Sequence, residues 1–102
     1  MDQKTVINIL SNCYKNEKRK LIDSASGNNE YSEYVLKTSK KICDTLEKNV
    51  TYLKDDDYFI IYNEVIKGKK GRWYQGYLSE SSYYRHRKVA YRKYIRSLNV
   101  IE

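Results

Sequence analysis

With 102 residues, of which 40% are hydrophobic and 32% charged, the chain has the length and apolar content of one folded domain rather than of a disordered tail. No run reaches the roughly 18 apolar residues that a membrane-spanning helix needs, and the first residues lack the basic start and apolar run of a signal peptide. We therefore expect a cytoplasmic protein with no membrane partner. Proline is absent, which favours helices.

The positive charge is concentrated in the last third of the chain. Residues 1–66 contain ten Lys and Arg against eleven Asp and Glu, a net charge of −1, whereas residues 67–102 contain ten against two, a net of +8. Together they give the formal net charge of +7. Such an asymmetry is typical of a surface that binds a polyanion. The alternative is a solvated helix, although charge that serves solubility is usually mixed in sign.

The first half of the chain predicts two helices. Apolar residues recur at spacings of three and four from residue 2 to residue 22, as one face of a helix requires. Residues 23–29 are small or turn-forming and predict a loop. The same apolar spacing returns from residue 30 to residue 53, which predicts the second helix.

Three consecutive acids, Asp55, Asp56 and Asp57, precede the apolar run of a third predicted helix over residues 58–67. Acids at this place are most simply the cap and first turn of a helix, where they accept bonds from free N–H groups and oppose the helix dipole. Two alternatives remain: a site for a divalent ion, and a strand over residues 58–62, where the apolar pattern also fits alternation.

Metal and cofactor sites are not expected elsewhere in the chain. Cys13, Cys43 and the single histidine, His86, are too few for a structural zinc site, which usually needs four such ligands. Reduced thiols suit the expected compartment. The basic third also offers no pair of carboxylates, and His86 has no obvious acidic partner in the sequence, so we expect no enzyme.

A glycine-bounded basic segment, residues 68–71, follows the third predicted helix. It lacks the length and the closing Lys-Ser/Thr of a phosphate-binding loop, so we interpret it as a connector whose lysines contact phosphates. Residues 72–78 then predict a short helix that buries Trp73 and Tyr77, which stand four apart on one face. Ser79 predicts the cap of a last helix, with its side chain accepting a bond from the N–H of Ser81 or Ser82.

The last predicted helix, residues 80–98, has two different sides. On a helical wheel, its core side carries Tyr83, Arg87, Ala90, Tyr91, Tyr94 and Leu98. Its other side carries a continuous basic stripe of Arg85, Lys88, Arg92 and Arg96. Arg87 must extend its charged end out from the apolar side, and Val89 lies near the basic stripe.

A two-helix unit with a tight turn, whose second helix starts with small polar residues and carries a basic stripe, is typical of a helix-turn-helix that binds DNA. The first turns of the second helix would meet base edges and its flanks would meet phosphates. The predicted base contacts are Ser81, Ser82, Tyr84, Arg85 and Lys88. The predicted backbone contacts are Lys69, Lys70, Arg72, Ser79, His86, Arg92 and Arg96.

The same residues resemble a known family. Ser79-x-x-Ser82-Tyr83-Tyr84-Arg85 is similar to the S-x-x-T-Y-Y-R segment of the ArpU-type phage late transcriptional regulators and, more distantly, to region 4 of bacterial sigma factors. Small mycoplasma proteins share the form W-Y-x-x-Y-x-S-x-S-x-Y-Y-R, which runs here from Trp73 to Arg85. The resemblance covers about residues 57–98, and it implies a transcription regulator that binds DNA through the last helix.

The sequence thus predicts one all-α domain over residues 1–102, with about five helices and a C-terminal helix-turn-helix. Residues 55–102 form the DNA-binding part, and residues 1–54 offer a surface for a partner or for a homodimer. The predicted function is sequence-specific binding of double-stranded DNA by a nucleoid-associated transcription regulator. The alternatives are an RNA-binding module, because the twelve tyrosines interleaved with arginine could stack on unpaired bases, and a protein that interacts with RNA polymerase.

Overall fold

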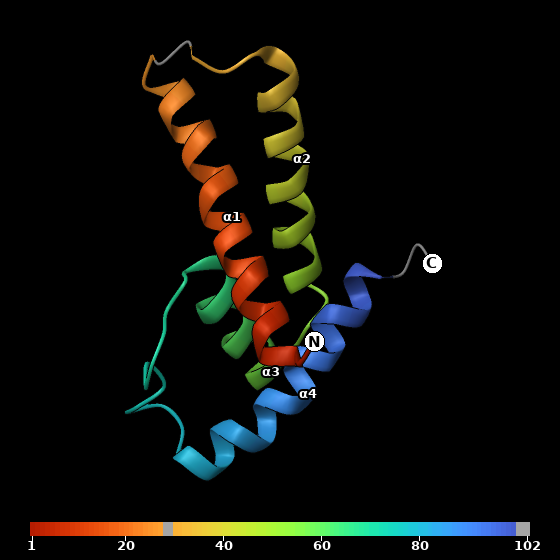
Figure 1. The fold of residues 1–102 in the computed structure, drawn as a ribbon. Coiled ribbons are helices and arrows are strands. Elements are labelled where there is room, and N and C mark those ends of the chain that lie inside the picture. The colour runs from red at the N-terminus through yellow and green to blue at the C-terminus, as the bar shows by residue number, and fades with distance from the viewer. Residues whose placement is uncertain (28–29, 100–102) are drawn as a thin grey trace.

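The computed structural model describes residues 1–27 and 30–99, and within these ranges the chain forms helices and turns without any strand (Figure 1). The predicted all-helical class is confirmed, and the alternative of a strand over residues 58–62 is wrong. The helices are α1 (Gln3–Ala25), α2 (Glu33–Val50), α3 (Asp55–Ile61), the π-helical segment η1 (Tyr62–Ile66) and α4 (Glu80–Leu98). None of the described helices is both long and apolar enough to cross a membrane.

Helices α1 and α2 form a long antiparallel hairpin (Figure 1). Both start at side-chain caps: Asp2 accepts a bond from the N–H of Thr5 at 2.8 Å, and Ser32 from the N–H of Val35 at 3.2 Å. Helix α1 continues past its predicted end at Ile22 into the predicted loop, because the small residues that follow tolerate a helix when nothing interrupts it.

Helices α3, η1 and α4 pack across one end of this hairpin (Figure 1). One core contains side chains from every helix and does not divide near residue 54. The largest side chains that solvent hardly reaches are Ile7, Val50, Ile60, Ile61, Val65, Tyr91 and Tyr94. Burying each such side chain stabilises the fold by about 1.5 to 3 kcal/mol relative to leaving it exposed. The core therefore holds α4 against the rest of the molecule.

The acidic start of α3 differs in detail from the prediction. Asp55, Asp56 and Asp57 do form the first turn, but the cap residue is Lys54, and no side chain makes a capping bond. Asp55 has a φ of 53°, a left-handed conformation that aspartate tolerates better than most residues. The interpretation of the aspartates as first-turn residues is confirmed, and their role as the cap is wrong.

The predicted short helix over residues 72–78 does not form. These residues belong to the connector between η1 and α4, residues 67–79, and they form a series of turns instead. The N–H of Gln75 donates a bond to the Arg72 carbonyl at 3.1 Å, and the N–H of Tyr77 donates one to the Tyr74 carbonyl at 3.0 Å. Gly76, in the middle of the predicted helix, has a φ of 90°, which interrupts a right-handed helix. Consequently the helix before α4 ends at Ile66, and the predicted tight turn in front of α4 is absent.

The aromatic residues of this connector also differ from the prediction. Trp73 is partly buried, but Tyr77 is 69% exposed, so the two do not share a buried face. Tyr74 is buried instead and stacks on Tyr83, with ring centroids 3.9 Å apart. Residues four apart lie on the same face only in a helix, and this segment is not helical, so the spacing does not predict a shared buried face.

Candidate nucleic-acid interface

The start of α4 is built as the sequence predicted. Ser79 is the cap residue, and its Oγ accepts a bond from the N–H of Ser82 at 3.2 Å. The hydroxyl oxygens of Ser79 and Ser81 lie 3.5 Å apart at the exposed helix start. Ser82 is partly buried. This arrangement leaves a helix N-terminus with small side chains facing solvent, where backbone N–H groups favour an anion.

The inner side of α4 is fixed by three tyrosines. Tyr83, Tyr91 and Tyr94 are buried together with Ala90, as the wheel predicted. The hydroxyl of Tyr94 donates a bond to the carbonyl oxygen of Leu46 at 2.9 Å, which ties α4 to α2. Because rings of this size fit only one packing arrangement, α4 has a defined rotation about its own axis.

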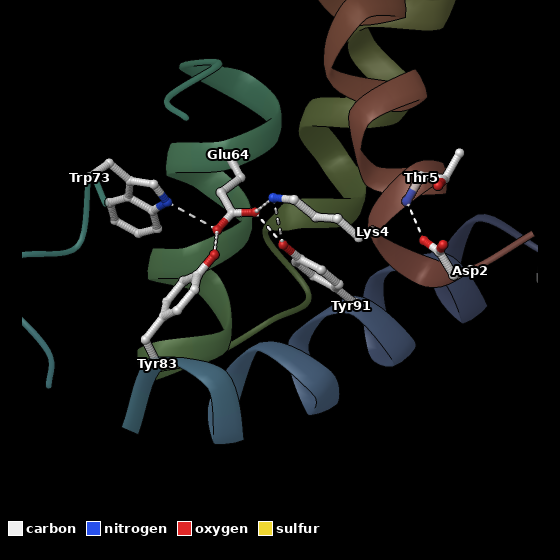
Figure 2. Close-up of polar contacts among 7 residues, drawn as sticks. All are labelled: Asp2, Lys4, Thr5, Glu64, Trp73, Tyr83 and Tyr91. Carbon is white, nitrogen blue, oxygen red and sulfur yellow. Dashed lines mark hydrogen bonds and ion pairs between the residues drawn. The ribbon is translucent and has the colours of Figure 1, made fainter. Parts of the chain in front are cut away.

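A buried carboxylate joins α4 to three other parts of the chain (Figure 2). Glu64, on η1, is 3% exposed. Its carboxylate accepts bonds from the hydroxyls of Tyr83 and Tyr91 and from Nε1 of Trp73, the last at 3.0 Å. The ammonium group of Lys4, on α1, approaches Oε1 at 3.3 Å and is also 3.3 Å from the Tyr91 hydroxyl. We call these five residues the Glu64 cluster.

The Glu64 cluster was not predicted from the sequence. Its one signal is that Glu64 is the single acid inside the apolar run of residues 58–67, and an acid there must either face solvent or find donors. The donors come from residues 60 positions before it and up to 27 positions after it, so local spacing does not identify them. The cluster fixes how η1, the connector and α4 sit relative to one another.

Burial alters the titration of the tyrosines in this cluster. It raises the pKa of Tyr83 to about 12, and the adjoining Glu64 carboxylate acts in the same direction. The pKa of Tyr91 is raised further for the same two reasons. Both hydroxyls carry their protons at neutral pH, as ordinary tyrosines do, and act as donors to Glu64; the raised pKa extends this state to higher pH.

The outer side of α4 carries the predicted basic stripe. All four of its side chains are exposed, and we call them the α4 stripe: Arg85, Lys88, Arg92 and Arg96. Within the described part of the chain, none of the four pairs with a carboxylate. Unpaired cations on one side of a rigid helix create a positive potential that attracts a polyanion.

The edge of α4 that faces α3 is different, because acids lie opposite its cations. His86 Nε2 lies 3.4 Å from Asp56 Oδ2, and Lys93 Nζ lies 3.0 Å from Asp57 Oδ2. The expectation that His86 lacks an acidic partner is wrong, since folding brings the start of α3 beside it. A phosphate that approached His86 would also approach the carboxylate of Asp56.

The other edge of α4 is aromatic. Tyr84 is 46% exposed, and the guanidinium of Arg87 lies over its ring at 4.9 Å from the centroid. The same guanidinium lies 5.4 Å from the centroid of Tyr91. Arg87 thus occupies the apolar side, as predicted, by stacking its charge on tyrosine rings.

Three predicted backbone contacts, Lys69, Lys70 and Arg72, lie on the connector and are exposed. The connector does not hang free, because Trp73 bonds to Glu64 and Tyr74 stacks on Tyr83. These basic residues are therefore held on the same substructure as α4, although they do not belong to a helix.

The two cysteines are free thiols, Cys13 partly buried and Cys43 buried. Burial raises the pKa of both, which keeps them protonated and poorly nucleophilic. Among the residues that the structure describes, no group of three or more His, Cys, Asp or Glu could hold a metal ion.

Comparisons with protein-family models, with curated proteins and with solved structures found no match. The resemblance of about residues 57–98 to ArpU-type regulators and to sigma-factor region 4 stays a prediction from the sequence. The candidate interface accordingly depends on its own geometry: the helix α4 packed on the core, the α4 stripe with no carboxylate partner among the described residues, and an exposed basic connector.

Proposed function

We propose that the protein binds double-stranded DNA in a sequence-specific way and regulates transcription, with α4 lying in the major groove. The observation that carries this proposal is the α4 stripe, which places four cations, without a carboxylate partner in the described ranges, on the solvent side of a helix whose other side is fixed by buried tyrosines. The major groove is wide enough for an α-helix, and cations that neutralise phosphates release counterions, which favours binding.

The side chains of α4 divide by position into two roles. The first turns carry the base contacts Ser81, Ser82, Tyr84, Arg85 and Lys88, of which Arg85 can donate two bonds to one guanine. Arg92 and Arg96, farther along the stripe, contact phosphates. Ser79, at the start of α4, and His86, on the edge that faces α3, are the remaining backbone contacts of this helix, and His86 is the weaker one because of its neighbour Asp56.

In this proposal α3 and η1 act as the first helix of a helix-turn-helix and α4 as its recognition helix. Residues 67–79 replace the tight turn with a longer connector, and the Glu64 cluster provides the fixed geometry that a tight turn otherwise gives. Lys69, Lys70 and Arg72 on the connector would contact the phosphates beside the groove.

A second candidate, binding of single-stranded RNA, is favoured by two exposed rings. Tyr77 is 69% exposed on the connector, and Tyr84 is 46% exposed beside the α4 stripe. Stacking on an exposed aromatic side chain contributes about 1 to 3 kcal/mol per unpaired base. Tyr77→Ala separates the two functions, because Tyr77 has no role in the DNA proposal, whereas its loss weakens RNA binding strongly if bases stack there.

Two variants with equal charge test the DNA proposal. The first replaces the α4 stripe with glutamine, and the second replaces four exposed lysines of α2 with glutamine: Lys37, Lys40, Lys41 and Lys48. Each removes four positive charges. We expect the first to reduce the slope of log affinity against log salt by about 2, because the phosphate contacts of Arg92 and Arg96 are lost, and the second to leave it nearly unchanged.

The assay is fluorescence anisotropy of a labelled duplex over a range of salt concentrations, with circular dichroism as the check that both variants fold. Equal loss of binding in the two variants would mean that DNA responds to net charge alone. The assignment of the interface to α4 would then be wrong.

A further inference from the structure

A second basic surface contains none of the residues assigned to DNA. It is a groove between α1 and the end of η1 with a volume of about 410 Å³, and we call it the α1–η1 groove. Its lining comprises Ser11, Tyr14, Lys15, Lys18, Arg19, Ile22, Val65, Ile66, Lys67 and Gly68. This volume falls within the range of about 300 to 1,000 Å³ that is usual for small-molecule sites.

The lining of the α1–η1 groove combines an apolar floor with cationic walls. Three apolar or aromatic side chains of the lining form this floor: Tyr14 and Val65, which are buried, and Ile22, which is 57% exposed. The four charged residues of the lining are all basic: Lys15, Lys18, Arg19 and Lys67. None of these cations pairs with a carboxylate in the part of the chain that the structure describes.

These two properties together define the chemistry of a ligand. Four unpaired cations around one concave site raise the local concentration of anions, and Arg19 and the lysines provide donors for phosphate oxygens. The apolar floor gives no benefit to a bare inorganic ion, but it can bury the body of an organic ligand. The lining thus fits a molecule that has both several negative charges and an apolar or planar part.

We propose that the α1–η1 groove binds a small phosphorylated molecule of the nucleoside polyphosphate class, with its phosphates on Arg19 and the lysines and its base against the apolar floor. This site does not depend on DNA binding, because it uses α1 and the end of η1 rather than the α4 stripe. The two proposals can therefore fail separately.

Isothermal titration calorimetry of the whole chain in metal-free buffer tests the groove, with ATP, inorganic pyrophosphate and adenosine as probes. We expect saturable binding of ATP at one site, and weaker binding of the other two, since each offers only half of the required chemistry. Binding of pyrophosphate as tight as that of ATP would overturn the role of the floor. Absence of saturable ATP binding at millimolar concentration would overturn the site itself.

Matched variants locate the binding. Arg19→Gln and Lys67→Gln should each lower ATP affinity about tenfold, as loss of one charge-assisted contact implies. Lys37→Gln and Lys40→Gln, on the exposed side of α2, remove the same charge and should change it less than about twofold. If the variants of α2 lose as much ATP affinity as those of the groove, ATP is attracted by net charge alone, and the proposed site is refuted.

A change of the floor gives an independent check that does not alter charge. Ile22→Ser affects an exposed side chain, so the fold should tolerate it. ATP affinity should fall several-fold while that of pyrophosphate stays the same. A variant that binds both probes like the parent would show that the base does not lie on Ile22.

Discussion

Replacement of Glu64 by glutamine should lower the free energy of unfolding by about 2 to 4 kcal/mol. In the native cluster Oε1 faces Lys4 and Tyr91, and Oε2 faces Trp73 and Tyr83. Glutamine replaces one of these oxygens with an NH₂ group, which is itself a donor.

The size of this loss of stability depends on which of the groups bonded to Glu64 can accept a bond from the new NH₂ group. The tyrosine hydroxyls can rotate to accept a bond, but the N–H of Trp73 cannot, so the amide oxygen must keep the position facing Trp73. The NH₂ group then faces Lys4, and the remaining bonds lose their charge assistance. A loss of about 1 kcal/mol for each of two to four bonds gives about 2 to 4 kcal/mol in the free energy of unfolding.

Thermal unfolding measured by circular dichroism and by the fluorescence of Trp73, the single tryptophan, provides the assay. A change of 2 to 4 kcal/mol lowers the Tm of a domain of this size by about 8 to 30 °C. The control is Asp44→Asn, which removes a carboxylate from an exposed ion pair with Lys40 and should cost less than about 1 kcal/mol. If the two variants unfold at the same temperature, the Glu64 cluster does not hold the fold together as described.

Three further predictions concern DNA and pH. Arg85→Ala should cost about 1 to 3 kcal/mol at a specific duplex and relax one base position, whereas Arg96→Ala should weaken all duplexes alike in anisotropy titrations; equal effects on every duplex would contradict the two roles. With about five phosphates neutralised, log affinity should fall with log salt at a slope of about −4 to −5, and a flat response would remove the polyanion surface. Unfolded tyrosines ionise near pH 10, but burial holds the pKa of Tyr83 at about 12, so stability should be full below pH 10 and fall as the pH rises toward 12. Melting curves across this range, with tyrosinate absorbance as a second readout, check that direction.

The helices with regular apolar spacing could be predicted from the sequence because their burial follows a local period. The core side of α4 is the best example, since Tyr83, Ala90, Tyr91 and Tyr94 are buried as the wheel requires. The exposure of the α4 stripe follows from the same period. The helix ends in the structure differ from the predicted ends by a few residues, which is usual at helix termini.

The connector could not be predicted in the same way. Trp73 and Tyr77 have helical spacing, but Gly76 takes a left-handed conformation, and the aromatic contacts with Glu64 and Tyr83 determine the path instead. These contacts join positions that are distant along the chain, as does the pair of His86 with Asp56. The spacing of residues along the chain does not indicate such distant pairs. The Glu64 cluster and the acidic edge of α4 could therefore be found only from the folded structure.

Selection from a random duplex pool, run beside a random single-stranded RNA pool at moderate salt, tests the proposed function most directly. The proposal assigns Arg85 and Lys88 to base edges, and it therefore predicts that duplex is retained and that the retained duplexes share a sequence motif. Retention of duplex without any motif would limit α4 to backbone contacts. Preferential recovery of RNA would contradict the central claim and assign the Tyr77 and Tyr84 surface to unpaired bases.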